Sequence, residues 1–195
     1  MAGIPYVIEK GPNNQERSYD LFSRLLKDRI VFIRGLIGEG YADAVVAQLL
    51  FLESDSPEKD IYMYINSPGG LISEMYGIYD AMSYVKPNIT TMGYGQCVSA
   101  GSFLLAAGTK GKRYVLPNAN IMIHEMSSGA DGKFNDIKNR YKHMEKLYER
   151  MAEHYVEFTG QDIDKVKKDM ERDYYMSAEE AKEYGLIDEI QYNRE

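Results

Sequence analysis

A chain of 195 residues, with 44% hydrophobic and 27% charged side chains, has the composition of a globular protein long enough to bury a substantial core. Its formal net charge of −7 argues against a surface built for nucleic acid or anionic lipid, and no apolar run is long enough to span a membrane. A single cysteine excludes an internal disulfide, and no secretion or transit signal is recognisable, so we expect a cytoplasmic protein.

Residues 1–20 are polar and contain the run Gly-Pro-Asn-Asn, which predicts a flexible arm or loop ahead of a single domain at residues 21–195. From residue 30 onward, a short β-branched or aromatic strand is followed three times by a segment with helical periodicity. Three such units predict an α/β fold with a mainly parallel sheet and with functional groups at the carboxyl ends of the strands. The expected strands cover residues 30–35, 60–66, 89–95, 113–117, 120–126 and 186–190, and the expected helices cover 42–55, 71–86 and 99–108.

Apolar residues in the next segment are spaced alternately three and four apart, which forms a helical seam about 25 residues and roughly 37 Å long. A helix of that length is too long to pack wholly against a domain with a radius of gyration of about 16 Å. We therefore expect part of it to project and meet another subunit, with a core helix as the alternative. A capping box at residues 177–180, closed by Gly185, predicts one more short helix. The seam consists of Phe134, Ile137, Tyr141, Met144, Tyr148, Met151, Tyr155 and Phe158.

Two nucleophilic side chains lie where the third expected strand turns into its helix. Ser99, followed by Ala100 and Gly101, stands at the junction, where a sharp turn presents a side chain and free helix N–H groups favour an adjacent anion. The alternative is an ordinary helix N-cap, a position that serine favours. For Cys97 we favour a small buried thiol beneath the turn over a reactive thiolate.

His124 ends an expected strand, from which its side chain can reach the edge that carries Ser99; a structural histidine is the alternative. His143 and His154 fall within the long helix and are more typical of surface or interface residues than of a general base. Residues 67–70 read Ser-Pro-Gly-Gly, which lets backbone N–H groups approach a ligand as an oxyanion hole requires, although ordinary tight turns share this composition. No metal-ligand spacing and no GxxxxGK[ST] loop occurs, so we expect no cofactor in this chain.

Taken together, these motifs resemble one family, ClpP, the proteolytic subunits of the Clp protease. The likeness runs from about residue 4 to residue 190 with the motifs in the family's order, and it favours the catalytic interpretation of Ser99. The motifs are YINSPGG at 64–70, the Gly95 to Gly101 turn, GTKGKRYVLPN at 108–118, IMIH at 121–124, Glu-Arg-Asp at 171–173 and MSAEEAKEYGLID at 176–188.

The resemblance implies a ClpP/crotonase-like fold and a serine endopeptidase. Ser99 corresponds to the nucleophile, His124 to the general base and Asp173 to the acid that orients the imidazole. The backbone N–H groups of Gly70 and Ala100 correspond to the oxyanion hole. These residue types suit the chemistry, because a serine hydroxyl is a weak nucleophile until a neighbouring imidazole accepts its proton.

The resemblance also implies a tetradecamer of two stacked heptameric rings, joined through a handle at about residues 125–158 and an inter-ring contact at Arg172. Substrate would be threaded into the chamber by a separate AAA+ unfoldase, a Clp ATPase, which uses the ATP that this chain has no loop to bind. The family's docking pocket for that ATPase maps to Tyr62, Tyr64, Tyr84, Met92, Tyr94, Tyr114 and Leu116.

The chain departs from the family pattern at four places. Cys97-Val98 stands where the family commonly has small alanines, and Ala100 stands where it often has Met. Glu125-Met126 replaces the usual Gln-Pro after the histidine, and residues 127–144 of the handle are unusual. Gln191 occupies a docking-pocket position that is usually apolar. We expect a self-compartmentalising endopeptidase acting on unfolded polypeptides. The alternative is a ring subunit that is structural, or active only with a second ClpP-like chain. An acyl-CoA-processing crotonase shares the fold but does not need the Ser-His-Asp set.

Overall fold

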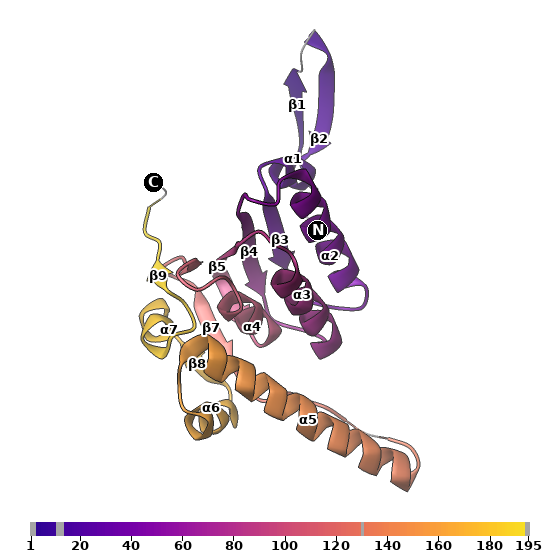
Figure 1. Ribbon diagram of the computed structural model, residues 1–195, viewed down its shortest axis with the longest axis vertical. Coiled ribbons are helices and arrows are strands. Elements are labelled where there is room, and N and C mark those ends of the chain that lie inside the picture. Colours follow the sequence, from indigo (N-terminus) through magenta and orange to yellow (C-terminus); the bar gives the residue numbers. More distant parts are fainter. Residues whose placement is uncertain (1–2, 11–13, 130, 194–195) are drawn as a thin grey trace.

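The central sheet of the computed structural model contains seven strands, of which five follow the order β3-β4-β5-β6-β9 with all neighbours parallel (Figure 1). The strands are β3 (Ile30–Arg34), β4 (Ile61–Ser67), β5 (Ile89–Val98), β6 (Arg113–Val115), β7 (Asn120–Ile123), β8 (Tyr174–Met176) and β9 (Glu189–Ile190). The predicted α/β class with a mainly parallel sheet is confirmed.

The structure describes residues 3–10, 14–129 and 131–193. The central part of the predicted N-terminal loop, one residue of the predicted handle and both ends of the chain therefore lie outside the described residues. They are Gly11, Pro12 and Asn13 in the loop, Ala130 in the handle, and residues 1–2 and 194–195 at the ends.

The sheet divides along β5. Residues 91–93 of this strand pair with β6, whereas residues 96–98 pair with β7, and β8 then adds to β7 in the antiparallel direction. A register shift between Ile65 and Ser67 accompanies the division. The carboxyl ends of β4, β5 and β7 consequently lie next to one another, and this edge positions the site described below.

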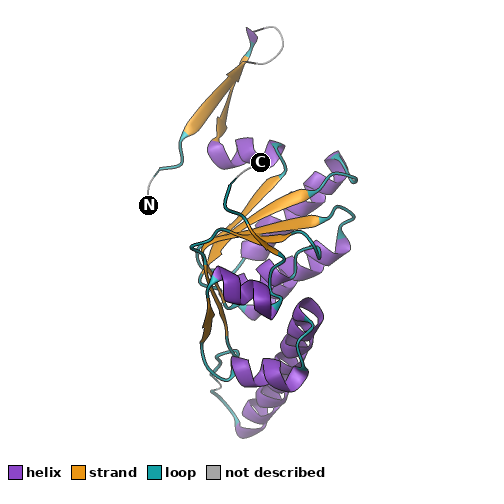
Figure 2. Ribbon diagram, turned by 90° about the vertical axis from the view of Figure 1, so that its left-hand side faces the viewer, coloured by secondary structure: helices purple, strands orange, loops and turns teal. Residues whose placement is uncertain are grey.

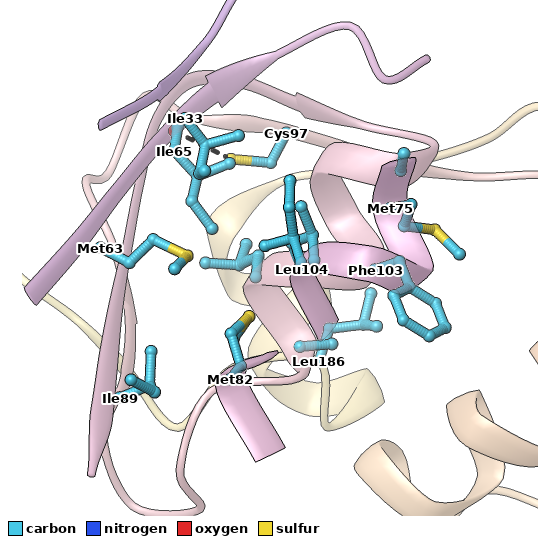
Figure 3. Close-up of a cluster of buried hydrophobic side chains, with 14 of the residues drawn as sticks. Ile33, Met63, Ile65, Met75, Met82, Ile89, Cys97, Phe103, Leu104 and Leu186 are labelled. Carbon is cyan, nitrogen blue, oxygen red and sulfur yellow. Dashed lines mark hydrogen bonds between the residues drawn. The ribbon is translucent and has the colours of Figure 1, made fainter. Parts of the chain in front are cut away.

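Three helices, α2 (Tyr41–Asp55), α3 (Ile72–Tyr84) and α4 (Ala100–Ala106), cover one face of the sheet (Figure 2). Alternate strand residues such as Ile33 and Ile65 point into this layer and are fully buried with Phe103 and Leu104 of α4 (Figure 3). Each fully buried side chain of this size contributes about 1.5–3 kcal/mol. The buried layer therefore holds α4, and the turn that precedes it, in a fixed position.

The N-terminal segment forms a hairpin, β1 (Tyr6–Lys10) paired antiparallel with β2 (Glu16–Asp20), which stands away from the main sheet (Figures 1 and 2). A short helix, α1 (Leu21–Lys27), follows. Glu9 of β1 forms ion pairs with Arg24 and Lys27 of α1. The predicted arm therefore contains two strands, which the polar composition around the β-forming run Tyr-Val-Ile did not indicate.

The long helix α5 (Phe134–Thr159) is followed by α6 (Ile163–Met170) and α7 (Ala178–Tyr184). The carboxyl-terminal part of α5 is buried beside the sheet, while its amino-terminal part projects away from the body (Figure 1). Projection agrees with the prediction from helix length, and a contact with another subunit stays a prediction. The predicted capping box of α7 is also confirmed, with Ser177 and Glu180 bonding reciprocally and Gly185 in the left-handed region.

Candidate active site

Three of the four candidate residues lie just after the carboxyl ends of neighbouring strands, at one edge of the sheet. Gly70 follows β4, Ser99 follows β5 and His124 follows β7, all at carboxyl ends. The fourth, Asp173, immediately precedes β8. Because β8 runs antiparallel to β7, its start lies at that same edge. In open parallel sheets this edge is where ligands usually bind.

Ser99 occupies a strained backbone position, with φ 57° and ψ −121°, at the turn into α4. Ser99 is the N-cap residue of α4, but its side chain makes no capping hydrogen bond, so the usual reason for a serine at this position does not apply. Its N–H donates to the carbonyl of Met122 in β7, at 2.9 Å. A non-glycine residue in such a conformation persists only where its surroundings enforce it, which is common at functional sites.

The Ser-Pro-Gly-Gly turn lies directly against this serine. A Cβ atom at Gly69, which has φ +96°, would lie only 2.7 Å from the Cβ of Ser99. Ser67 holds the turn, because its hydroxyl donates to the carbonyl of Gly35 at 2.6 Å and accepts from the N–H of Gly69 at 3.0 Å. Glycine is therefore required by close approach to Ser99.

His124 and Asp173 are brought together by strand register. Ile123 pairs with Tyr174 across β7 and β8, so the next residues along, His124 and Asp173, also face each other. Nδ1 of His124 lies 2.9 Å from Oδ1 of Asp173. A carboxylate at Nδ1 fixes the tautomer with the proton on that nitrogen and leaves Nε2 as an acceptor.

Ser99 and His124 line one small cavity of about 60 Å³, together with Gly70 and Ala100. No hydrogen bond joins the Ser99 hydroxyl to the imidazole in the described part of the chain. Catalytic pairs are often loose before substrate binds, so this separation does not exclude proton transfer between them. The cavity adjoins a cleft of about 730 Å³ that shares its lining at Gly70, Ile72, Met126 and Ser127 and extends to Arg140, His143 and Met144 of α5.

The backbone N–H groups of Gly70 and Ala100, both in the cavity wall, have no hydrogen-bond partner among the described residues. Ile37 bonds to the carbonyl of Gly69 and to the N–H of Leu71, at 2.9 and 2.8 Å. Since successive peptide groups of an extended strand point in opposite directions, the N–H of Gly70 points away from Ile37. The N–H of Ala100 is in the first turn of α4, where the helix supplies no acceptor. A cavity with two such donors suits an anionic oxygen.

Cys97 is fully buried beneath the turn, and its thiol lies 3.4 Å from the carbonyl of Ile65 (Figure 3). Burial raises the pKa of the Cys97 thiol to about 12, so the nucleophilic thiolate is suppressed at neutral pH. The prediction of a small buried thiol is confirmed.

The other two histidines differ from each other. His143 is exposed on the projecting part of α5 and borders the larger cleft. His154 is half-buried inside an aromatic cluster, with its ring 4.8 Å from Tyr79 and 5.7 Å from Phe103. Aromatic side chains of this same chain cover most of its ring, so His154 is only partly exposed, and a position at a subunit interface stays a prediction.

Arg172 is exposed and borders a third cleft that also contains His124, Glu125, Glu171 and Asp173. The unusual Glu125 thus lies beside the histidine and lines the small cavity as well. Three carboxylates and one arginine surround this side of the imidazole.

The residues assigned to a docking pocket lie mainly on the sheet face opposite to α2, α3 and α4. Tyr64, Met92 and Tyr114 are register partners across β4, β5 and β6, and the rings of Tyr64 and Tyr94 are 6.5 Å apart. Tyr62 and Leu116, at 44% and 41% exposure, flank this row. Tyr84 does not join it, because it lies at the end of α3 in the helical layer.

Sequence reasoning missed two residues below the cavity. Ser102 and Tyr155 are buried and lie within hydrogen-bond distance of each other, at 3.2 Å between hydroxyl oxygens. Ser102 follows Ser99 by one helical turn, and this spacing was the available signal. Tyr155 was identified only as part of the apolar seam, which gives no sign that its hydroxyl has a partner.

None of the helices that the structure describes combines the length and hydropathy needed to cross a bilayer. Comparison with protein families gives a match over nearly the whole chain: residues 13–194 align with the family model described as Clp protease.

Proposed function

The chain belongs to the Clp protease family and is a peptidase, and from this premise we propose that it is a self-compartmentalising serine endopeptidase acting on unfolded polypeptides. One observation carries the serine mechanism. The His124–Asp173 contact of 2.9 Å lies at the cavity that also contains the strained Ser99. An oriented imidazole and a serine hydroxyl that line the same cavity form the arrangement that activates serine as a nucleophile.

In the acylation step, Ser99 Oγ attacks the carbonyl carbon of the scissile peptide while Nε2 of His124 accepts the hydroxyl proton. Asp173 stabilises the imidazolium that forms and keeps its ring oriented. Collapse of the tetrahedral intermediate breaks the C–N bond, and the imidazolium proton passes to the leaving amine. An acyl-enzyme ester on Ser99 remains.

In deacylation, His124 accepts a proton from water, whose oxygen attacks the ester carbonyl. The second tetrahedral intermediate releases the carboxylic acid product, and the proton returns to Ser99 Oγ. The N–H groups of Gly70 and Ala100 would stabilise the negative oxygen of both intermediates. Removing one donor of this kind typically costs a factor of about 10²–10³ in kcat.

Unfolded substrate would be supplied by a partner ATPase of the AAA+ class. The chain has no GxxxxGK[ST] loop, so ATP would be used by that partner. The aromatic row around Tyr64, on the sheet face opposite to α2, α3 and α4, offers an apolar surface for docking. The projecting part of α5 and Arg172 would join copies of the chain into two stacked heptameric rings.

A subunit that works only beside a second ClpP-like chain is the alternative, and the unusual Glu125 next to His124 favours it. Measuring particle mass and peptidase activity on one purified sample separates the two cases. A large, active particle supports the homo-oligomer, whereas a small, inactive species that becomes active with a second chain supports mixed assembly.

Paired variants test the nucleophile. Ser99→Ala should abolish hydrolysis of short peptides, and Cys97→Ala should retain it, because the buried thiol has no part in the chemistry. Retention of activity by Ser99→Ala, together with loss in a folded Cys97→Ala variant, would reverse the assignment.

A further inference from the structure

The hydroxyl of Ser102 lies directly below the turn that presents Ser99. Its Oγ is 2.7 Å from the carbonyl oxygen of Ser99 and 2.7 Å from that of Met122. The hydroxyl oxygen of Tyr155 lies 3.2 Å away on the other side. Ser102 is fully buried and Tyr155 is 1% exposed.

Chemistry fixes the direction of these hydrogen bonds. Carbonyl oxygens only accept, so the single proton of Ser102 is donated to the carbonyls of Ser99 and Met122. The oxygen of Ser102 is then left to accept the proton of the Tyr155 hydroxyl. Burial raises the pKa of Tyr155, so this group remains a donor. The result is one directed chain from α5 through α4 to the turn at Ser99 and to β7.

These hydrogen bonds join the turn that carries Ser99 to the strand that precedes His124. Met122 is in β7, two residues before His124, and its carbonyl also accepts the N–H of Ser99 at 2.9 Å. Ser102 therefore bonds to both sides of the connection that sets the position of Ser99 relative to His124. Tyr155 extends the same connection to the buried part of α5.

The Ser102 hydroxyl is not needed to give the carbonyls of Ser99 and Met122 a hydrogen-bond partner. The carbonyl of Ser99 already accepts from the N–H of Phe103 at 3.1 Å, and that of Met122 from the N–H of Ser99. An alanine at position 102 would leave neither carbonyl unpaired. What the hydroxyl adds is constraint at a residue with φ 57°, a conformation that needs its surroundings to enforce it.

We infer that Ser102 and Tyr155 are positioning residues, which hold Ser99 and the strand that carries His124 at a fixed separation. This inference rests on the proposed serine mechanism. It predicts that loss of the hydroxyls lowers the rate of the chemical step and leaves peptide binding largely unchanged.

The test compares Ser102→Ala, Tyr155→Phe and the double variant with Thr91→Val in the assembled protein. Thr91 is a matched control, because its buried hydroxyl donates to the carbonyl of Leu105 at 2.8 Å, at the far end of the same helix. Each variant is assayed for kcat and KM on a short peptide, for the rate of fluorophosphonate labelling and for thermal unfolding.

Ser102→Ala should lower kcat and the labelling rate about tenfold with KM changed less than about twofold, as misplacement of a reacting group predicts. Tyr155→Phe should lower kcat about threefold. The double variant should be no slower than Ser102→Ala, because both changes interrupt the same series of hydrogen bonds. Thr91→Val should keep kcat within about twofold despite a comparable loss of stability.

Equal kcat in Ser102→Ala and wild type overturns the inference alone, as does an equal loss of kcat in Thr91→Val and Ser102→Ala. If Ser102→Ala fails to fold, Tyr155→Phe provides the test instead. An unchanged fluorophosphonate labelling rate in Tyr155→Phe would show that these hydrogen bonds do not position Ser99. A wild-type protein that hydrolyses peptides but is never labelled at Ser99 overturns the proposed function, and the inference falls with it.

Discussion

The two parts of helix α5 carry one apolar seam but lie in different surroundings. Tyr155 and Tyr141 occupy the same seam position two heptads apart, yet Tyr155 is 1% exposed and Tyr141 is 58% exposed. Tyr155 packs against Phe103 of α4, with ring centroids 5.6 Å apart. Phe134, at the start of the helix, is 79% exposed.

This contrast shows what helical periodicity does and does not determine. The three-four spacing identifies which side of the helix is apolar, but it gives no information on what covers that side. In this chain the body of the domain covers the carboxyl-terminal part, where Tyr155 reaches the floor of the candidate site. The amino-terminal part has no cover among the described residues, which is the condition expected of a surface that meets another subunit.

The largest effect is expected from truncating the same residue type in the two parts. Tyr155→Ala should lower the free energy of unfolding by about 3–5 kcal/mol, because it opens a cavity in the core. Tyr141→Ala should change subunit stability by no more than about 0.5 kcal/mol, because its ring packs against little within the subunit. Urea unfolding at equal protein concentration measures both. Equal losses of unfolding free energy in the two variants would show that the two parts of α5 do not differ in burial as described.

The buried part of α5 is also held by an ion pair. Arg113 donates to the carbonyl of Phe158 at 2.9 Å and pairs with Asp188 through Nη2 and Oδ1, at 2.7 Å. Asp188→Asn leaves the buried guanidinium without its counter-charge and should cost about 3 kcal/mol. Glu189→Gln is the matched control, because it breaks the exposed pair with Lys182 and should cost about 0–1 kcal/mol. A smaller loss in Asp188→Asn than in Glu189→Gln would show that the pair does not hold α5.

The same pair sets a pH dependence. Burial alone would raise the pKa of Asp188, but hydrogen bonds from Arg113 outweigh it and hold this pKa below its usual value. A carboxyl whose pKa is lowered on folding contributes stability above its unfolded pKa of about 3.9 and loses it as pH falls through the folded value. Wild type should therefore lose stability below about pH 4 more steeply than Asp188→Asn, which has no such carboxyl. Parallel acid unfolding curves would contradict this.

An effect on assembly, rather than on subunit stability, is expected near the projecting part of α5. Arg172→Ala should give smaller particles with reduced peptidase activity, because Arg172 is proposed to contact the opposite ring and lies next to Asp173. Light scattering and peptide hydrolysis on one sample measure both quantities. A variant with the wild-type mass and full activity would remove Arg172 from the account.

The smallest effect concerns a second, partly exposed apolar surface, the aromatic row on the sheet. Tyr64→Ser should weaken binding of a partner ATPase about tenfold, the equivalent of about 1.4 kcal/mol, while short-peptide hydrolysis is spared. Gln191→Leu should strengthen the same binding, because it replaces a polar side chain at the assigned pocket. Unchanged affinity in both variants would show that the partner binds elsewhere.

Much of the fold could be predicted because strong local patterns coincide with burial. The strand around Ile33 alternates buried residues with half-buried ones, and the Ser177–Glu180 capping box is recognisable from four consecutive residues. Helix α6 and strand β8 were missed. Strand β8 is only three residues long, and it exists because β7 offers an edge with which Tyr174 can pair.

For the candidate site, the sequence could indicate which residues take part but not the distances and hydrogen bonds between them. Ser99 and His124 could be identified as candidates from their positions at strand ends, but Asp173 and the grouping of all three came from family resemblance, since nothing within the sequence joins positions so far apart. The register that places Asp173 opposite His124 depends on tertiary pairing of β7 with β8. The bonds from Ser102 to the carbonyls of Ser99 and Met122 likewise depend on the division of the sheet at β5.

The most direct test of the central claim is to locate the adduct of a fluorophosphonate probe by mass spectrometry of the digested wild-type protein. We predict one phosphonylated residue, Ser99, with labelling lost when His124 is changed to Ala, because the hydroxyl is then no longer activated. An adduct on any other residue, or undiminished labelling of Ser99 in a folded His124→Ala variant, would contradict the proposed serine mechanism.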